Sequence, residues 1–113
     1  MTTLTAYGAL GAAIVLEVAG TTFLQMSQQF TKLVPTLLMS ACYLVAFYFL
    51  TLAIKTIPIG LAYAIWSGLG IVLISLIGYV LFRQTLDLAA LFGIALIIVG
   101  VLVVNVFSKS MPL

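Results

Sequence analysis

One acidic residue stands inside a long apolar stretch near the start of the chain. Glu17 is the only charged residue between Leu4 and Leu24, in a chain that is 65% hydrophobic and 5% charged. A carboxylate at the middle of a membrane helix costs about 2.5–3.5 kcal/mol on insertion scales, so such residues usually line an ion pathway, relay protons or pair with a cation. Snorkelling suits long Lys and Arg side chains near helix ends better than this glutamate. We therefore interpret Glu17 as a functional residue, in an ion pathway, in a proton relay or as the counter-ion of a cationic ligand.

Aromatic residues inside other apolar stretches are candidates for contacting that ligand. Tyr63 and Trp66 are three positions apart and share a helix face, as Tyr43 and Phe47 do at a spacing of four. Trp prefers the headgroup region, so a Tyr/Trp pair deep in a membrane span, in the same chain as a buried carboxylate, predicts a cation site. Tyr7 is a weaker candidate. The alternative for all of them is packing against lipid or neighbouring helices.

The elements that must position these residues are four apolar segments. A bilayer core of about 30 Å takes about 20 residues as a helix, and the chain has 113 residues with a mean hydropathy of +1.42. The predicted spans are 4–24, 34–54, 58–82 and 88–107. They leave only short loops, so the sequence predicts an all-α membrane protein formed by a single integral membrane domain over residues 1–113.

The composition argues against several classes of function. The chain has no His, and its one cysteine, Cys42, lies inside the second span. Metal, haem and nucleotide sites therefore lack candidate residues, and we expect no cofactor and no enzyme activity. The net charge of +2 comes from basic residues spread one per loop, which does not predict nucleic-acid binding. An ion gradient remains as the energy source.

Loop charges predict no preferred orientation in the membrane. With four spans, Lys55 and Lys109 fall on one side, and Lys32 and Arg83 on the other. Since orientation follows the Lys/Arg excess, two against two favours insertion both ways and pairing as an antiparallel dual-topology homodimer. A four-helix monomer is also too thin to shield a cavity from lipid. The alternative is a single orientation that short loops signal only weakly.

Glycines in the last two spans have two interpretations. Gly68 and Gly70 lie in mid-helix, where they serve either as a hinge or as packing positions. Gly93 and Gly100 are seven apart with Ile97 between them, which predicts a tight helix–helix seam at the dimer interface.

Several motifs together identify a family. They are the runs 16–22 (LEVAGTT), 42–43 (CY), 58–70 (PIGLAYAIWSGLG) and 86–88 (LDL), and Gly93 to Gly100 followed by Asn105. Over almost its whole length the chain resembles the small multidrug resistance family. The resemblance implies a multi-pass transporter of the bacterial plasma (inner) membrane. It also implies an antiparallel homodimer whose two membrane glutamates bind either protons or a cationic drug.

Within that family the substrate class depends on the turn after Glu17. Guanidinium exporters usually have a Trp-Ala pair where this chain has Gly20 and Thr21, so the sequence favours proton-coupled export of lipophilic and quaternary ammonium cations. The stretch from Lys55 to Gly60 looks more like the guanidinium exporters. Export of guanidinium or polyamines therefore stays open, as do a small dual-topology ion channel and a partner subunit that does not transport alone.

Overall fold

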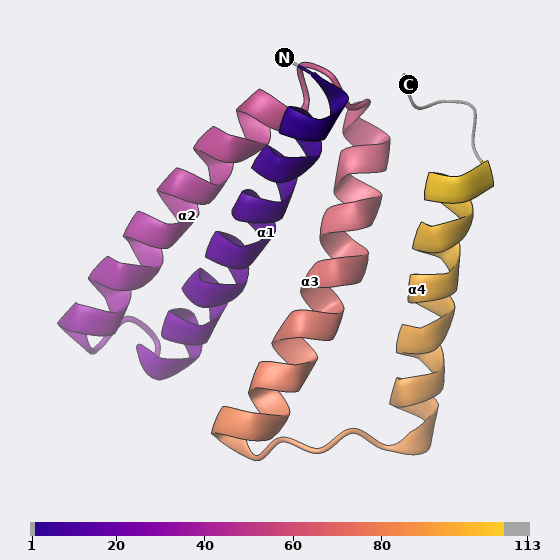
Figure 1. Cartoon of the computed structure of the whole chain (residues 1–113). Helices are drawn as coiled ribbons and strands as arrows, with labels where there is room; N and C mark the ends of the chain where they lie inside the picture. The colour runs from indigo at the N-terminus through magenta and orange to yellow at the C-terminus, as the bar shows by residue number, and fades with distance from the viewer. Residues whose placement is uncertain (1, 108–113) are drawn as a thin grey trace.

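The structure is a computed structural model that describes residues 2–107, and over that range the chain forms four α-helices (Figure 1). They are α1 (Thr3–Met26), α2 (Leu33–Ala53), α3 (Ile59–Phe82) and α4 (Leu88–Phe107). All four are long enough and apolar enough to cross a membrane. The prediction of an all-α protein with four candidate spans is confirmed. Lys109, which entered the orientation count, lies outside the described residues.

The helix ends follow local chemistry. The Thr2 side chain accepts a hydrogen bond from the Thr5 backbone N–H at 3.1 Å, and Asp87 Oδ1 accepts one from the Ala90 N–H at 2.9 Å. Each bond satisfies a backbone donor that a helix start leaves free. Pro58, which the predicted third span includes, precedes the first residue of α3 and occupies its N-cap position.

The core of the bundle lies along one face of α1. Helix α1 contacts both α2 and α3, whereas α4 contacts α3. Four α1 residues at a spacing of four are buried: Ala6, Leu10, Ile14 and Val18. They pack with Ala53, Ile57, Ala62 and Ile65 from the end of α2, the following loop and α3. The last of these α1 residues, Val18, directly follows Glu17, so the core fixes the helix that carries the acid.

Helix α4 stands apart from the other three (Figure 1). None of its residues is buried. It packs closely against α3 at Gly68, where an added Cβ would lie 2.5 Å from Val101 Cγ2. A second link joins it to α1, because the Tyr7 hydroxyl donates to Asn105 Oδ1 at 3.4 Å. Few contacts therefore hold α4 within one chain.

The connection from α3 to α4 is extended. Arg83 ends α3 in the left-handed conformation with φ 55°, and the Gln84 N–H then donates to the Gly78 carbonyl at 2.9 Å. This bond closes the helix end. Residues 83–87 form neither helix nor strand, so the two helices are joined by a spacer rather than by a tight turn.

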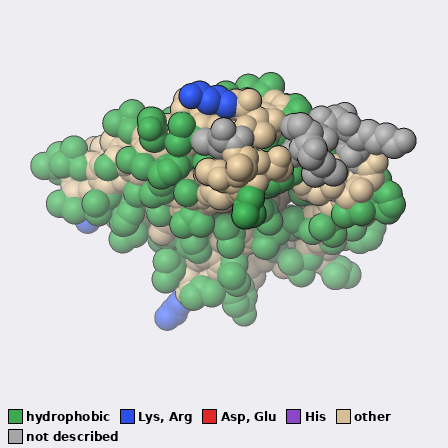
Figure 2. Space-filling view, turned by 45° about the horizontal axis from the view of Figure 1, so that its top comes forward, with side chains coloured by type: hydrophobic (Ala, Val, Ile, Leu, Met, Phe, Trp, Pro, Cys, Tyr) green, Lys and Arg blue, Asp and Glu red, His purple; other side chains and the backbone are tan. Residues whose placement is uncertain are grey.

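The outer surface is largely apolar. Figure 2 shows hydrophobic side chains over most of one face, with Lys and Arg at its margins. Large apolar residues with high exposure occur on every helix, among them Leu4, Leu44, Val80 and Phe92. Such a surface suits contact with lipid, with the cations near the headgroups.

Candidate functional site

Glu17 lies where two adjoining compartments of one open cavity meet. Its side chain is half-buried, and both compartments share Glu17, Tyr63 and Trp66 as lining residues. The first, called here the Phe47 compartment, has a volume of about 250 Å³ and reaches Tyr43 and Phe47 on α2. The second, the Ser67 compartment, has a volume of about 290 Å³ and adds residues of α3 and Thr21 of α1. Three helices thus contribute to the site.

Hydrogen bonds hold one oxygen of the Glu17 carboxylate. Thr21, one helical turn further along α1, donates from its hydroxyl to Glu17 Oε1 at 3.0 Å. Because that proton is directed at the carboxylate, the 2.8 Å contact between the Thr21 and Tyr43 hydroxyls has Tyr43 as donor. A chain of two hydrogen bonds therefore runs from α2 to the acid. Thr21 was not among the predicted site residues, although a hydroxyl four positions after a membrane acid was the signal for this bond.

The second carboxylate oxygen faces α3. A Cβ added at Gly70 would lie 3.7 Å from Glu17 Oε2 and 3.7 Å from Trp66 Cδ1. The glycine therefore keeps the α3 surface open beside the acid, and the Trp66 indole lies next to the same space. This arrangement gives Gly70 a place in the wall of the site.

The aromatic residues form an incomplete wall. The rings of Phe47 and Trp66 are 6.4 Å apart between centroids, with an angle of 34° between their planes. Phe47 and Tyr63 remain 58% and 67% exposed although both line the cavity. One chain therefore supplies part of an aromatic enclosure and leaves one side open.

Four of the five predicted aromatic candidates converge on Glu17, and one does not. Tyr43, Phe47, Tyr63 and Trp66 line the Phe47 compartment. Tyr7 lines neither compartment around Glu17 and instead bonds to Asn105. A role for Tyr7 in ligand contact remains a prediction.

Position 20 is closely packed by an aromatic ring. A Cβ added at Gly20 would lie 2.6 Å from Cε1 of Tyr43 and 3.3 Å from Cys42 Cβ. Side chains do not approach this closely, so Gly20 lets α2 come near enough for Tyr43 to reach Thr21. A large residue at position 20 does not fit this arrangement.

The other glycines to which the sequence assigned a role differ in their surroundings. Gly68 packs against Val101, which makes it a contact position in this structure; a hinge at Gly68 and Gly70 remains a prediction. Gly93 and Gly100 have open space around them, and Ile97 is 40% exposed. The predicted seam on α4 thus lies on a face that no described part of the chain covers.

Known proteins match this chain over most of its length. The model of the family described as "Small Multidrug Resistance protein" matches residues 5–97. The chain is 50% identical over 103 residues to the multidrug transporter EmrE of Escherichia coli strain K12, covering 91% of this chain and 94% of that one. It is 50% identical to the multidrug transporter PA4990 of Pseudomonas aeruginosa, covering 95% and 97%. It is 49% identical to the quaternary ammonium compound-resistance protein QacF of Klebsiella aerogenes, covering 88% and 91%.

These matches confirm the predicted class, that of a bacterial multi-pass membrane transporter rather than an enzyme. The matched region includes Glu17 and every residue that lines the two compartments around it. The chain belongs to the small multidrug resistance family.

Proposed function

We propose that this protein is a proton-coupled antiporter that exports lipophilic and quaternary ammonium cations. The observation that carries the proposal is the position of Glu17, a membrane carboxylate at the junction of two compartments lined by aromatic side chains. Relatives at about 50% identity are named as multidrug transporters or quaternary ammonium compound-resistance proteins, which supports the ligand class.

Competition for one carboxylate gives the coupling. An ionised carboxylate removed from water is unfavourable unless a proton or a cation compensates it. Thr21 satisfies Oε1, so Oε2 is the oxygen directed toward the ligand space beside Gly70 and Trp66. A proton and a cationic ligand then exclude one another at Glu17. Exchange of the two across the membrane is antiport, and each charge crossing 100 mV contributes about 2.3 kcal/mol.

Aromatic faces account for a broad range of ligands. Cations are attracted to aromatic rings with about 0.5–2 kcal/mol per contact and without strict directionality. Tyr63 and Trp66 border both compartments, and Tyr43 and Phe47 border one. Flat or rounded lipophilic cations of different shapes can therefore use the same wall.

The packing at position 20 favours these ligands over guanidinium. Family members that export guanidinium usually have a Trp-Ala pair where this chain has Gly20 and Thr21. A tryptophan at position 20 would collide with the Tyr43 ring. Its replacement by glycine is what lets Tyr43 line the Phe47 compartment and bond to Thr21.

A second copy of the chain would complete the site. The exposed rings of Phe47 and Tyr63 and the open α4 face around Gly93 and Gly100 support an antiparallel dual-topology homodimer. In it, two Glu17 side chains would share one cavity. Alternating access follows if the two copies exchange conformations, with α3 pivoting at Gly68 against Val101 and at Gly70 beside Glu17.

Proton release on ligand binding tests the proposal. Tetraphenylphosphonium added to the purified protein in weak buffer should release protons, and Glu17→Gln should neither release protons nor bind the cation. Release by the Glu17→Gln variant would contradict the role of this residue. Counterflow in sealed vesicles separates the channel alternative, because only a carrier accumulates labelled cation against an unlabelled load.

A further inference from the structure

Gly70 is a glycine that the conformation and packing of a single chain do not require. It lies inside α3, and none of the described glycines has a positive φ. Glycine in a helix interior is less stable than alanine. An alanine would also fit, because an added Cβ would lie 3.7 Å from its two nearest side-chain atoms, an ordinary van der Waals distance. The missing side chain therefore needs another explanation.

The other glycines of the bundle fall into two groups. Three have a side chain pressed against them, with an added Cβ at 2.5–3.0 Å from it: Gly20, Gly68 and Gly78. Five have nothing within 4 Å of an added Cβ: Gly8, Gly11, Gly60, Gly93 and Gly100. Gly70 differs from both groups, because a Cβ there would fit and would touch two residues of the candidate site.

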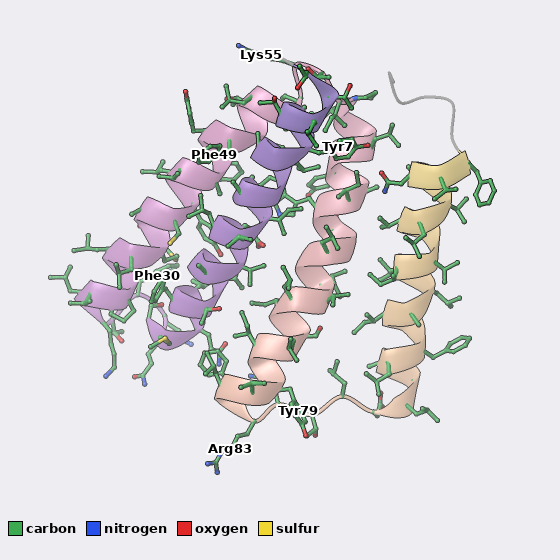
Figure 3. All side chains as sticks on the ribbon, in the orientation of Figure 1. Tyr7, Phe30, Phe49, Lys55, Tyr79 and Arg83 are labelled. Carbon is green, nitrogen blue, oxygen red and sulfur yellow. The ribbon has the colours of Figure 1, made fainter. Side chains whose placement is uncertain are left out.

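Those two residues are the acid and the tryptophan. The added Cβ would lie 3.7 Å from Glu17 Oε2 and 3.7 Å from Trp66 Cδ1. Glu17 comes from α1 and the other two residues from α3, and Figure 3 shows side chains of both helices directed into the space between them. Glu17, Trp66 and Gly70 all line the Ser67 compartment. Gly70 is therefore the floor of the gap between the carboxylate and the indole.

A quaternary ammonium ion needs this gap more than other cations do. Its nitrogen carries four carbon substituents and no N–H, so it reaches a carboxylate only through the surface of its alkyl groups. A proton needs no such room, and a primary ammonium ion donates small N–H groups directly to a carboxylate oxygen. A methyl group at position 70 would hold a bulky head group away from Oε2 by about 1.5 Å, one C–C bond length. The attraction between the two charges falls with that distance.

We propose that Gly70 sets the size of the cationic head group that can reach Glu17, and that its missing side chain is what admits quaternary ammonium ions. The inference rests on the proposed function, because it requires a cation to bind at Glu17, and it assigns head-group selectivity to one position. Gly70→Ala should therefore keep the fold and the proton site at Glu17, and should narrow the range of ligands.

Isothermal titration calorimetry with two ligands that share one aromatic body tests this selectivity. Benzyltrimethylammonium has a quaternary head group and benzylammonium a primary one, and both are cations at neutral pH. In purified Gly70→Ala, affinity for the quaternary ligand should fall at least tenfold, about 1.4 kcal/mol, and affinity for the primary one should stay within about twofold of the parent. Gly60→Ala is the matched control on the same helix, with nothing within 4 Å of an added Cβ, and should bind both ligands like the parent.

A second substitution gives room back at the same place. In a Trp66→Phe background the indole edge beside position 70 is gone, so Gly70→Ala should weaken benzyltrimethylammonium binding less than it does beside the indole. Circular dichroism and size-exclusion chromatography of each variant check that the helices and the assembly are retained.

Three results would overturn the proposal. Parent-like binding of benzyltrimethylammonium by Gly70→Ala would show that position 70 does not limit the head group. Equal losses for the two ligands would assign Gly70 to a pivot or to packing between copies, because either role affects both head groups alike. Loss of helix content in Gly70→Ala would make Gly70 a structural residue. A parent protein that binds neither cation would instead contradict the proposed function itself.

Discussion

Gly20→Ala should impair cation binding by moving a ring rather than by removing a contact. The added Cβ would lie 2.6 Å from Cε1 of Tyr43, whereas carbon atoms pack at about 3.5–4.0 Å. The ring must therefore move by about 1 Å. The Phe47 compartment is the open space beside Tyr43, so the ring moves into the volume that we assign to the ligand. The 2.8 Å contact with Thr21 is broken or stretched by the same shift.

The size of the effect follows from these two changes. Overpacking of a close contact typically costs about 1–3 kcal/mol, and loss of the Tyr43–Thr21 hydrogen bond about 0.5–1.5 kcal/mol. We expect the variant to fold with reduced thermal stability. Affinity for tetraphenylphosphonium should fall at least fivefold, which corresponds to about 1 kcal/mol.

Equilibrium binding of labelled tetraphenylphosphonium measures this effect, with Gly11→Ala as the matched control. Gly11 is on the same helix and has nothing within 4 Å of an added Cβ, so its substitution should leave affinity unchanged. In a Tyr43→Ala background the Gly20→Ala change should have little further effect, because the ring it collides with is gone. Equal losses for Gly11→Ala and Gly20→Ala, or the same Gly20→Ala loss without the Tyr43 ring, would refute the reasoning.

Three further predictions concern the site and the assembly. Glu17→Gln should keep the fold and lose proton-coupled uptake of labelled cation into acid-loaded vesicles; full transport would end the proposal. Trp66→Ala should weaken binding of flat aromatic cations at least tenfold, about 1.4 kcal/mol, and Trp66→Phe less; parent-like affinity of Trp66→Ala would make Trp66 a packing residue. A C-terminal tag should be accessible from both sides of the membrane, and two lysines added there should abolish activity alone but restore it with an oppositely biased variant; a single orientation of the parent would exclude dual topology.

The four spans could be predicted because length and apolar composition alone decide whether a helix crosses a membrane. The predicted second span, 34–54, differs from the observed Leu33–Ala53 by one residue at each end. Local backbone conformation was harder to foresee. Residues 28–30 adopt positive φ values of 49°, 64° and 65° with no glycine among them, and side-chain chemistry gives no signal for such a run.

The candidate site was predictable in its members but not in its connections. Glu17 and its aromatic neighbours differ from their surroundings in type, so their spacing places them on defined helix faces. The bond from Thr21 to Glu17 and the contact of Gly20 with Tyr43 depend on how close α2 comes to α1. That distance is a tertiary property. For the same reason the hydrogen bond of Tyr7 was not predicted, because its partner Asn105 lies 98 positions away in the sequence.

The geometry around Glu17 separates the selection of charge from the selection of shape. Oε1 is held by Thr21, which Tyr43 reaches from α2, so hydrogen bonds orient the carboxylate before any ligand binds. The exposed rings of Phe47 and Tyr63 are free of such bonds and can adapt to a ligand's outline. Under the proposed function, the fixed acid would select for a cation, and the aromatic wall would restrict its form only loosely. That division is what an exchanger of many lipophilic cations against one small ion needs.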